Sequence, residues 1–377
     1  MMNIHYISPS LLPSRSANSV HVALQCEGLV RAGAKVALYA KRTLKDANEL
    51  PSAIRAAYGI DLAGIDLKTC FSPSERGNVA RIAWFAMRSL PSDAGAILSR
   101  NVYASFLLAV LKRRPILFET HQLEIGPRKA LQRAIMTQPW VTTVLISRHL
   151  ERYLIEHHGT APTRTLILHD GARDGIIPVS EERRRSELGM GAEWDAVCGY
   201  FGHLYPGRGI EIIEAMARAR PRCLFLVYGG NPEDITARRQ TATMENLRFM
   251  GHVPHQEAMY AMARVDVLLM PYQASVSIGV SGHDTARWMS PMKMFEYMAA
   301  GVPLISSDLP VLREVLDDRR NARLAMPENP GHWVAALDEL LADPATAARI
   351  GRQAHADYRD RYSWTRRAEA LIAALKN

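Results

Sequence analysis

Glu296 lies on a predicted helix between a loop and a strand, within the segment SPMKMFEYMAAGVPLISSDLPVLREVL at 290–316. Such a helix presents its first amides above the strand ends of an open α/β sheet, where they can bind a diphosphate. A carboxylate one and a half turns later can accept two hydrogen bonds from a ribose diol. Ser290 is expected to cap the helix, Pro291 to take its first position and Gly301 to end it. The alternative is an ordinary helix with a solvated Glu296.

A cation and several glycines follow strands in the same half of the chain. Arg208 lies in GYFGHLYPGRGIEIIEAM at 199–216, just before a predicted helix. There it can bind diphosphate oxygens and stabilise a leaving nucleotide, or it can be a surface residue of a turn. Gly229 and Gly230 end one strand and Gly251 ends another, so backbone can approach a ligand closely there. Turn formation alone also explains these glycines.

The first half of the chain offers a second set of polar side chains. FETH at 118–121 ends a buried strand, and Glu119 and His121 are two residues apart, hence on one face. A histidine at such a place is either a reacting group or a hydrogen-bonded structural residue. The loop after the first strand lacks the G-x-G-x-x-G dinucleotide fingerprint, which argues against a dehydrogenase. Its polar residues can cap the next helix and offer hydroxyls to an acceptor: Ser16, Asn18 and Ser19.

Short apolar runs alternate with amphipathic segments along the whole chain. This pattern predicts parallel sheets covered by helices, an α/β fold of two doubly wound Rossmann-like domains. At 377 residues the chain also exceeds what one core usually serves. A polar stretch at 173–194 interrupts the alternation. We predict domains over 1–175 and 176–361, and a terminal amphipathic helix over 362–377 that packs back on the first domain.

The second half resembles the family 4 retaining glycosyltransferases of the GT-B fold. The resemblance is carried by 199–216, FLVYGG (225–230), LRFMGHVPHQEAMYAMARVDVLLMPY (247–272) and 290–316, and more weakly by FETH, VLIS (144–147) and LILHDGARD (166–174). It implies two Rossmann-like domains facing across a cleft, with the acceptor on the first and a nucleotide-sugar on the second. It assigns the reaction centre to His121, Arg208 and Glu296, and an acceptor contact to Glu119. The implied donor-binding residues are His203, Arg208, Gly229, Gly230, Gly251, Val253, Ser290, Pro291, Met292, Lys293 and Glu296.

This chain departs from the family pattern at two places. In the family an arginine follows the glycine of the first strand, where this chain has His203, and a lysine follows later, where it has Arg208. The family's paired glutamates are eight residues apart, and the first is replaced by Trp288. The departure resembles a subgroup with an SPxKxFEYMAAG motif, and it leaves donor sugar choice open. His283, Asp284 and Arg287 in the preceding loop are alternative sugar or phosphate contacts.

The resemblance implies front-face displacement with retention, in which the leaving diphosphate helps to deprotonate the acceptor. No acidic DxD-type motif is present, which is typical of metal-independent catalysis, and no cofactor is expected. The donor is a UDP-, GDP- or ADP-linked sugar, and the acceptor is a glycan or a lipid-linked molecule of polysaccharide, lipopolysaccharide or glycoconjugate synthesis. Two alternatives remain: a nucleotide-sugar 2-epimerase of the same architecture, and a nucleotide-sugar-binding protein with weakened catalysis.

Composition and charge distribution indicate where the protein is expected to act and which partners it is expected to bind. The four cysteines have no CxxC spacing, and no apolar run reaches 18 residues, so we expect a cytoplasmic protein with reduced thiols. Residues 1–175 hold 22 Lys and Arg against 13 Asp and Glu, whereas 176–377 hold 24 against 25. The basic half suggests an anionic partner, either a membrane surface or a phosphorylated substrate. A membrane partner would place the protein on the inner face of the membrane. RKALQRAIM at 128–136 is a candidate contact segment or a solvated helix face. No nucleic-acid-binding motif is present.

Overall fold

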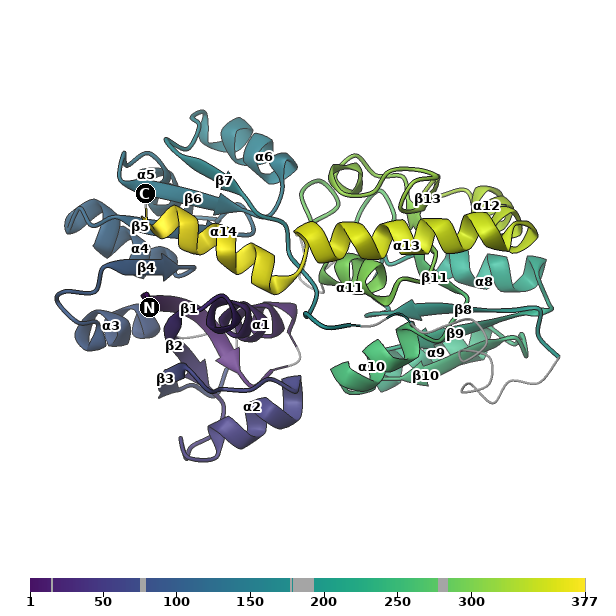
Figure 1. Ribbon diagram of the computed structural model, residues 1–377, viewed down its shortest axis with the longest axis horizontal. Helices are drawn as coiled ribbons and strands as arrows, with labels where there is room; N and C mark the ends of the chain where they lie inside the picture. Colours follow the sequence, from purple (N-terminus) through teal and green to yellow (C-terminus); the bar gives the residue numbers. More distant parts are fainter. Residues whose placement is uncertain (15, 75–78, 177, 179–192, 277–283, 377) are drawn as a thin grey trace. The chain divides into compact units, whose positions relative to one another are not determined.

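A computed structural model of the chain describes residues 1–14, 16–74, 79–176, 178, 193–276 and 284–376 (Figure 1). The chain divides into two compact units. The first unit comprises Met1–Asp170 and Ser363–Asn377, and the second comprises Gly171–Tyr362. Each unit has its own parallel sheet with helices packed on it, so the predicted fold class is confirmed.

The first unit contains a seven-stranded parallel sheet with the order β3-β2-β1-β4-β5-β6-β7. The order reverses next to β1, which pairs with both β2 and β4. In such sheets, ligand sites form beside the carboxyl ends of the strands where the order reverses. The strands are β1 (Asn3–Leu12), β2 (Lys35–Arg42), β3 (Ile65–Phe71), β4 (Ala96–Ser99), β5 (Ile116–Thr120), β6 (Val141–Leu145) and β7 (Thr165–Ile167).

Short polar side chains begin several helices of the first unit. Ser16 caps α1, Asn101 caps α4 and Ser147 caps α6, each by accepting hydrogen bonds from first-turn amides. The helices are α1 (Ala17–Arg31), α2 (Leu50–Tyr58), α3 (Val79–Ser89), α4 (Val102–Phe106), α5 (Pro127–Met136), α6 (Arg148–His158) and α14 (Trp364–Lys376); a π-helical turn, η1 (Leu107–Leu111), continues α4.

The C-terminal helix α14 belongs to the first unit and packs along α1. Gly28 of α1 makes this contact close, because a Cβ atom there would lie 2.5 Å from the carbonyl oxygen of Trp364. Trp364 is 1% exposed, and Leu371 of the same helix is fully buried. The terminal amphipathic helix therefore completes the core of the first unit, as the sequence pattern predicts.

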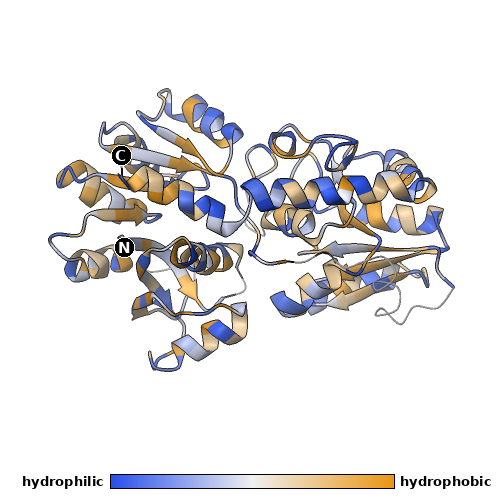
Figure 2. Ribbon diagram, in the orientation of Figure 1, coloured by the Kyte–Doolittle hydropathy of each residue, from blue (hydrophilic) through white to orange (hydrophobic). Residues whose placement is uncertain are grey.

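The second unit contains a six-stranded parallel sheet with the order β10-β9-β8-β11-β12-β13. Its order reverses at β8, where all six residues are buried, as expected of a central parallel strand. Figure 2 shows the strands of both units as largely hydrophobic. The strands are β8 (Ala196–Phe201), β9 (Cys223–Tyr228), β10 (Leu247–Gly251), β11 (Val267–Met270), β12 (Leu304–Ser307) and β13 (Arg323–Ala325).

Helices of the second unit cover both sides of this sheet (Figure 1). They are α8 (Ile210–Ala219), α9 (Pro232–Thr241), α10 (His255–Met262), α11 (Met292–Ala300), α12 (Pro330–Ala342) and α13 (Pro344–Arg361), with a 3₁₀ turn η2 at Leu312–Glu314. Among the described residues, no helix is long and apolar enough to cross a membrane.

Candidate functional site

Two cations of the second unit lie against aromatic rings beyond the carboxyl ends of β8 and β11. The guanidinium carbon of Arg208 is 5.1 Å from the ring centre of Tyr272, and its Nη1 donates a hydrogen bond to the Tyr272 hydroxyl at 3.0 Å. The Nζ atom of Lys293 is 4.2 Å from the ring centre of Tyr200 and 4.6 Å from that of Tyr272. Burial, and then the nearby charge of Arg208, lower the pKa of Lys293 well below its usual range. A bound anion would offset this repulsion, so the pair suits a ligand of concentrated negative charge.

The glycines beside these cations allow a close approach of backbone. A Cβ atom on Gly202, at the end of β8, would lie 3.2 Å from Nζ of Lys293. A Cβ atom on Gly229 would overlap the carbonyl group of Gly202, and one on Gly230 would lie 2.7 Å from the Leu204 side chain. Gly251 has φ of +79°, and a Cβ atom added there would meet no other residue within 4 Å, apart from its chain neighbours. Because residues 202 and 229 are glycines, the loops after β8 and β9 can approach each other closely beside the amino group of Lys293.

Glu296 lies on α11 one turn beyond Lys293 and is 7% exposed. Its Oε1 atom is 2.6 Å from Nε2 of His255, the first residue of α10. Burial lowers the pKa of His255, but the charge and hydrogen bond of Glu296 outweigh it, and the pKa of His255 is raised overall. The carboxylate therefore has a fixed partner on one oxygen, although the sequence did not point to His255.

The start of α11 differs from the prediction. The helix covers Met292–Ala300, and Pro291 is its N-cap, with φ of −75° and ψ of 121°. Ser290 is therefore not the N-cap, and Pro291 is not the first helical residue but the N-cap, which makes no side-chain cap hydrogen bond. Proline tolerates the N-cap conformation because its fixed φ suits it and its missing N–H would have no helical partner there. Gly301 ends the helix with φ of +69°, as predicted.

The remaining predicted donor residues differ in their contacts and burial. His203 stacks on Tyr205 with ring centres 4.7 Å apart, and burial, then Arg208 and Lys293, lower its pKa. His203 is therefore neutral near pH 7 and does not replace the arginine expected of the family. Val253, Pro291 and Met292 are partly buried, whereas Ser290 is 6% exposed.

The described residues before α11 differ in exposure: Arg287 is exposed, whereas its neighbour Trp288 is buried. Trp288 is 7% exposed. The Asp284 carboxylate accepts hydrogen bonds from the backbone amides of Val276 (2.8 Å) and Ala286 (2.9 Å), so both bonds engage it with protein. His283 lies outside the described residues.

A second polar cluster lies in the first unit, around Glu119 at the end of β5. Glu119 is 1% exposed, and its carboxylate accepts hydrogen bonds from the Tyr6 hydroxyl (3.0 Å) and from Nη2 of Arg367 on α14 (2.7 Å). Nε2 atoms of His21 and His121 lie 3.1 and 3.2 Å from its Oε1 atom. Burial raises the pKa of Glu119, but neighbouring cations, Arg367 first, hold it well below its usual range. The carboxylate predicted to contact an acceptor is thus surrounded by protein donors.

Arg100 indicates the tautomer of His121, and burial together with Arg100 lowers its pKa. Its Nη2 atom is 3.2 Å from Nδ1 of His121; because arginine only donates, Nδ1 accepts and the imidazole proton lies on Nε2, which faces Glu119. Burial, then the Arg100 charge, lower the pKa of His121 to about 4. His121, which is 21% exposed at its side chain, is therefore a neutral imidazole near pH 7.

Three potential metal ligands occur in the same cluster: His21, His121 and Asp170, with donor atoms within 4.8 Å of one another. The donor set does not suit a cation. Nε2 of His21 already faces Glu119, Nδ1 of His121 accepts from Arg100, and the guanidinium groups of Arg100 and Arg367 balance the carboxylates. A divalent ion would add charge beside two buried arginines.

The predicted acceptor residues of the first loop are largely engaged with protein. Ser16 is the N-cap of α1. The Asn18 amide donates to Oγ of Ser10 at 2.7 Å, and the Ser19 hydroxyl donates to the carbonyl of Leu11 at 2.7 Å. Helix capping is thus confirmed for Ser16, while contact with an acceptor stays a prediction for all three residues.

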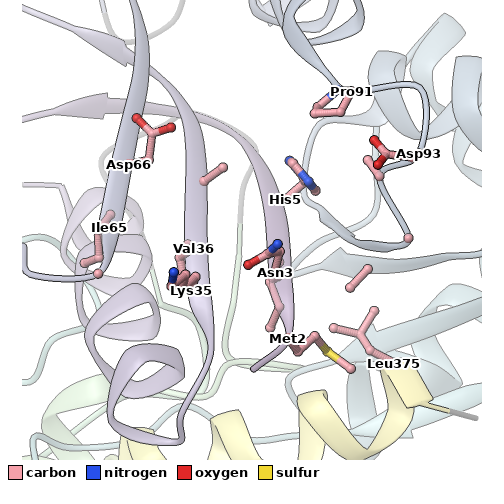
Figure 3. Close-up of a pocket in the computed structure, with 16 residues that line it drawn as sticks. Met2, Asn3, His5, Lys35, Val36, Ile65, Asp66, Pro91, Asp93 and Leu375 are labelled. Carbon is pink, nitrogen blue, oxygen red and sulfur yellow. The ribbon is translucent and has the colours of Figure 1, made fainter.

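A pocket of about 940 Å³ lies at the amino ends of the strands of the first sheet, opposite the ends that carry Glu119 (Figure 3). It is lined by the first residues of β1, β2, β3 and β4, with Pro91, Asp93 and Leu375 around it. Ligands of doubly wound sheets bind at the carboxyl ends of strands, and this pocket is at the amino ends. We therefore separate it from the candidate site.

Comparison with known proteins finds similarity to glycosyltransferases. Residues 208–373 match a family model described as glycosyl transferase-like. Sucrose-phosphate synthase from Thermosynechococcus elongatus superposes over 100% of this chain and 98% of its own with a TM-score of 0.75 at 17% identity. WaaG, a glycosyltransferase involved in lipopolysaccharide biosynthesis, superposes over 98% and 99% of the two chains with a TM-score of 0.66 at 16% identity. The fold is GT-B.

The GT-B neighbours include one solved with nucleotide. HepE of Anabaena, in complex with UDP, covers 100% of both chains with a TM-score of 0.70 at 17% identity. By sequence, the chain is 26% identical to D-inositol 3-phosphate glycosyltransferase of Gordonia bronchialis over 236 residues, 59% of this chain and 49% of that one. The chain spans about half the length of the curated relatives it matches.

Sequence reasoning missed several residues of both clusters. The rings of Tyr200 and Tyr272 contact Lys293. Both tyrosines are in strand-end segments of the predicted site, but the sequence pattern does not assign a role to their rings. His255 follows the loop at 251–254 and is the first residue of a helix. That position beside a predicted ligand loop was the signal that could have identified it as a site residue. In the first unit, the partners of Glu119 come from β1, α1, the residue after β4, and α14. Only the fold brings these elements together.

Proposed function

We propose that this chain is a retaining glycosyltransferase that moves a sugar from a nucleoside diphosphate to a glycan or lipid-linked acceptor. The observation that carries the proposal is the pair of cations, Arg208 and Lys293, beside the carboxylate of Glu296. The cations suit a diphosphate and the carboxylate suits a ribose diol. The match of 208–373 to glycosyl transferase-like proteins and the UDP bound by HepE support this choice of ligand.

In the proposed reaction, the bond between the donor anomeric carbon and the diphosphate oxygen breaks. The acceptor hydroxyl oxygen forms a new bond on the same face of the sugar, and its proton passes to the leaving diphosphate. Arg208 and Lys293 stabilise the charge that develops on the diphosphate, so no divalent cation is required. The N-terminal unit, around His121, takes the acceptor. His121, neutral with its proton on Nε2, acts by hydrogen bonding and not as a general base.

Binding tests the central claim first. UDP, GDP and ADP are each added at a concentration about 100 times a dissociation constant in the micromolar range. At that concentration a bound ligand adds about 2.7 kcal/mol to the free energy of unfolding and raises the melting temperature. Arg208→Ala, if it weakens binding about ten-fold, should reduce the added stability to about 1.4 kcal/mol, and Glu296→Ala should reduce it too. Arg222→Ala, which removes an exposed ion pair with Asp195, should keep the full rise. If none of the three nucleotides stabilises the wild-type protein, the proposal is refuted.

Turnover separates the alternatives. With a nucleotide-sugar and a mixture of acceptors, a transferase releases nucleoside diphosphate in proportion to glycosylated product. A 2-epimerase releases free nucleotide and altered sugar without an acceptor. A binding protein releases neither, although its affinity depends on the same residues. Retention is checked by the anomeric configuration of the product in NMR, and metal independence by activity with excess EDTA.

We also propose that the basic unit contacts an anionic membrane, where lipid-linked acceptors occur. Helix α3 packs against α4, and α4 and η1 pack against α5. These elements and their adjoining loops expose three large apolar side chains, Trp84 (60%), Leu111 (63%) and Ile125 (56%). The exposed cations of the same segments are Arg81, Arg88, Lys112, Arg113 and Arg133. Apolar side chains among cations suit the interface of an anionic bilayer.

Vesicle sedimentation tests the membrane contact. The protein should bind vesicles of phosphatidylcholine with phosphatidylglycerol, release at high salt, and bind pure phosphatidylcholine poorly. Trp84→Ala and Lys112→Glu should weaken binding, and Arg222→Ala in the other unit should not. Equal binding to both vesicle types would contradict the proposal.

A further inference from the structure

The hydrogen bond between His255 and Glu296 joins two helices of the second unit at the candidate nucleotide site. The Nε2 and Oε1 atoms are 2.6 Å apart, and the side chains are 21% and 10% exposed. α10 packs against α11, so the two helices hold both ends of the bond. The pair is therefore built into the fold and is sheltered from water.

A carboxylate held in this way has one defined orientation. A short hydrogen bond to Oε1 fixes the rotation of the carboxylate about its last bond and leaves lone pairs of Oε2 in a set direction. A free glutamate would lose rotamer entropy when it binds two hydroxyl groups. A carboxylate fixed before binding avoids most of that loss, as residues that support metal ligands do for their partners.

We infer that His255 is a positioning residue that holds Glu296 for two hydrogen bonds from the ribose diol of the donor nucleotide. The inference rests on the proposed function, because it names a second residue for the same site. His255 itself touches the carboxylate and acts through it. The raised pKa of His255 agrees with a bond that is strong in the free protein.

The competing explanation is that His255 only ties α10 to α11. Its loss would then lower stability, and it would weaken every ligand of the site to a similar extent or none of them. A positioning role predicts a different result. The loss of affinity caused by the substitution must then depend on the hydroxyl groups of the ligand.

A thermodynamic cycle separates the two explanations. Calorimetry measures the affinities of UDP and of 2′,3′-dideoxy-UDP, which lacks both hydroxyls, for wild type and His255→Ala. GDP or ADP with its dideoxy form replaces this pair if it binds more tightly. We expect His255→Ala to weaken UDP about ten-fold, the lower range for a hydrogen bond to a charged group, and to change dideoxy-UDP less than about two-fold. His255→Gln, which keeps an N–H donor at the reach of Nε2, should restore most of the UDP affinity.

Controls make a failure informative. Glu257→Ala removes an exposed charge from the same helix and should change neither affinity. Melting temperatures of the variants show whether they are folded. If His255→Ala is not folded, His255→Leu, which fills more of the space and also lacks the N–H donor, replaces it. Equal weakening of both ligands, or no weakening of either, overturns the role of His255 while the nucleotide site stands. If no nucleoside diphosphate binds wild type, the proposed function and this inference both fall.

Discussion

Removal of the Arg367 charge should destabilise the first unit strongly, although the residue lies ten positions from the end of the chain. Arg367 on α14 is 3% exposed. Its guanidinium donates to Glu119 (2.7 Å), to the side-chain oxygen of Gln25 (2.6 Å) and to the carbonyl of His169 (3.0 Å). Arg367→Met keeps the apolar stem and removes all three bonds. Taking one partner from a buried ion pair costs about 3–5 kcal/mol, because it leaves the other charge buried.

The loss of stability caused by Arg367→Met should lie toward the lower end of that range. Glu119 keeps the Tyr6 hydroxyl at 3.0 Å and the Nε atom of Arg100 at 3.9 Å, so its charge is not left alone. We therefore expect a loss of about 3 kcal/mol for Arg367→Met. Because Glu119→Gln removes the charge itself, the double variant should lose at least about 1 kcal/mol less than the two single losses together.

The assay must report on the first unit alone, since the two units need not unfold together. Hydrogen exchange of the β5 amides in increasing urea gives that local stability. The pKa of Glu119 is lowered in the folded protein, so the stability that its charge provides is present above about pH 4.3, its unfolded pKa, and is lost as pH falls below it. The difference between wild type and Glu119→Gln should shrink accordingly. A coupling below about 0.5 kcal/mol at pH 7 would refute the reasoning.

Three further predictions concern single positions. Gly28→Ala should force α1 and α14 apart and cost about 1–3 kcal/mol in the same exchange assay; an unchanged exchange rate would contradict the close contact. His121, whose folded pKa is about 4, should remain neutral at pH 6 in an NMR titration, and its contribution to stability should be complete above about pH 6.5 and be lost as pH falls toward 4. Arg208→Ala and Lys293→Ala should each weaken nucleoside diphosphate binding about ten-fold and reduce its salt dependence, and an affinity that ignores salt would argue against the cations as ligands.

The sequence predicted elements well where their signals are local. The apolar residues of β8 and the glycine after α11 are visible in a few neighbouring residues, and both appear as expected. The start of α11 was misplaced because Ser290 and Pro291 suit either the cap or the first turn, and tertiary contacts decide between them. Local patterns therefore locate a helix better than they locate its first residue.

The surroundings of the site residues could not be predicted from spacing. Glu119 and His121 were placed together at the end of one strand, and they are hydrogen-bonded there. The donors that bury Glu119 come from Tyr6, 113 residues before it, and from Arg367, 248 residues after it. No periodicity relates residues at such separations. The role of a strand-end carboxylate therefore depends on partners that only the folded unit identifies.

The two clusters treat their charges in opposite ways, and this contrast favours the second unit as the place where an anion binds. Glu119 and Arg367 neutralise each other inside the first unit. Arg208 and Lys293 instead face aromatic rings, and among the described residues neither forms an ion pair within 4 Å. A ring face attracts a cation without cancelling its charge, so the field of Arg208 stays available to a ligand. The pKa of Lys293 is lowered by burial and by Arg208, and a bound anion would raise it and favour the charged form.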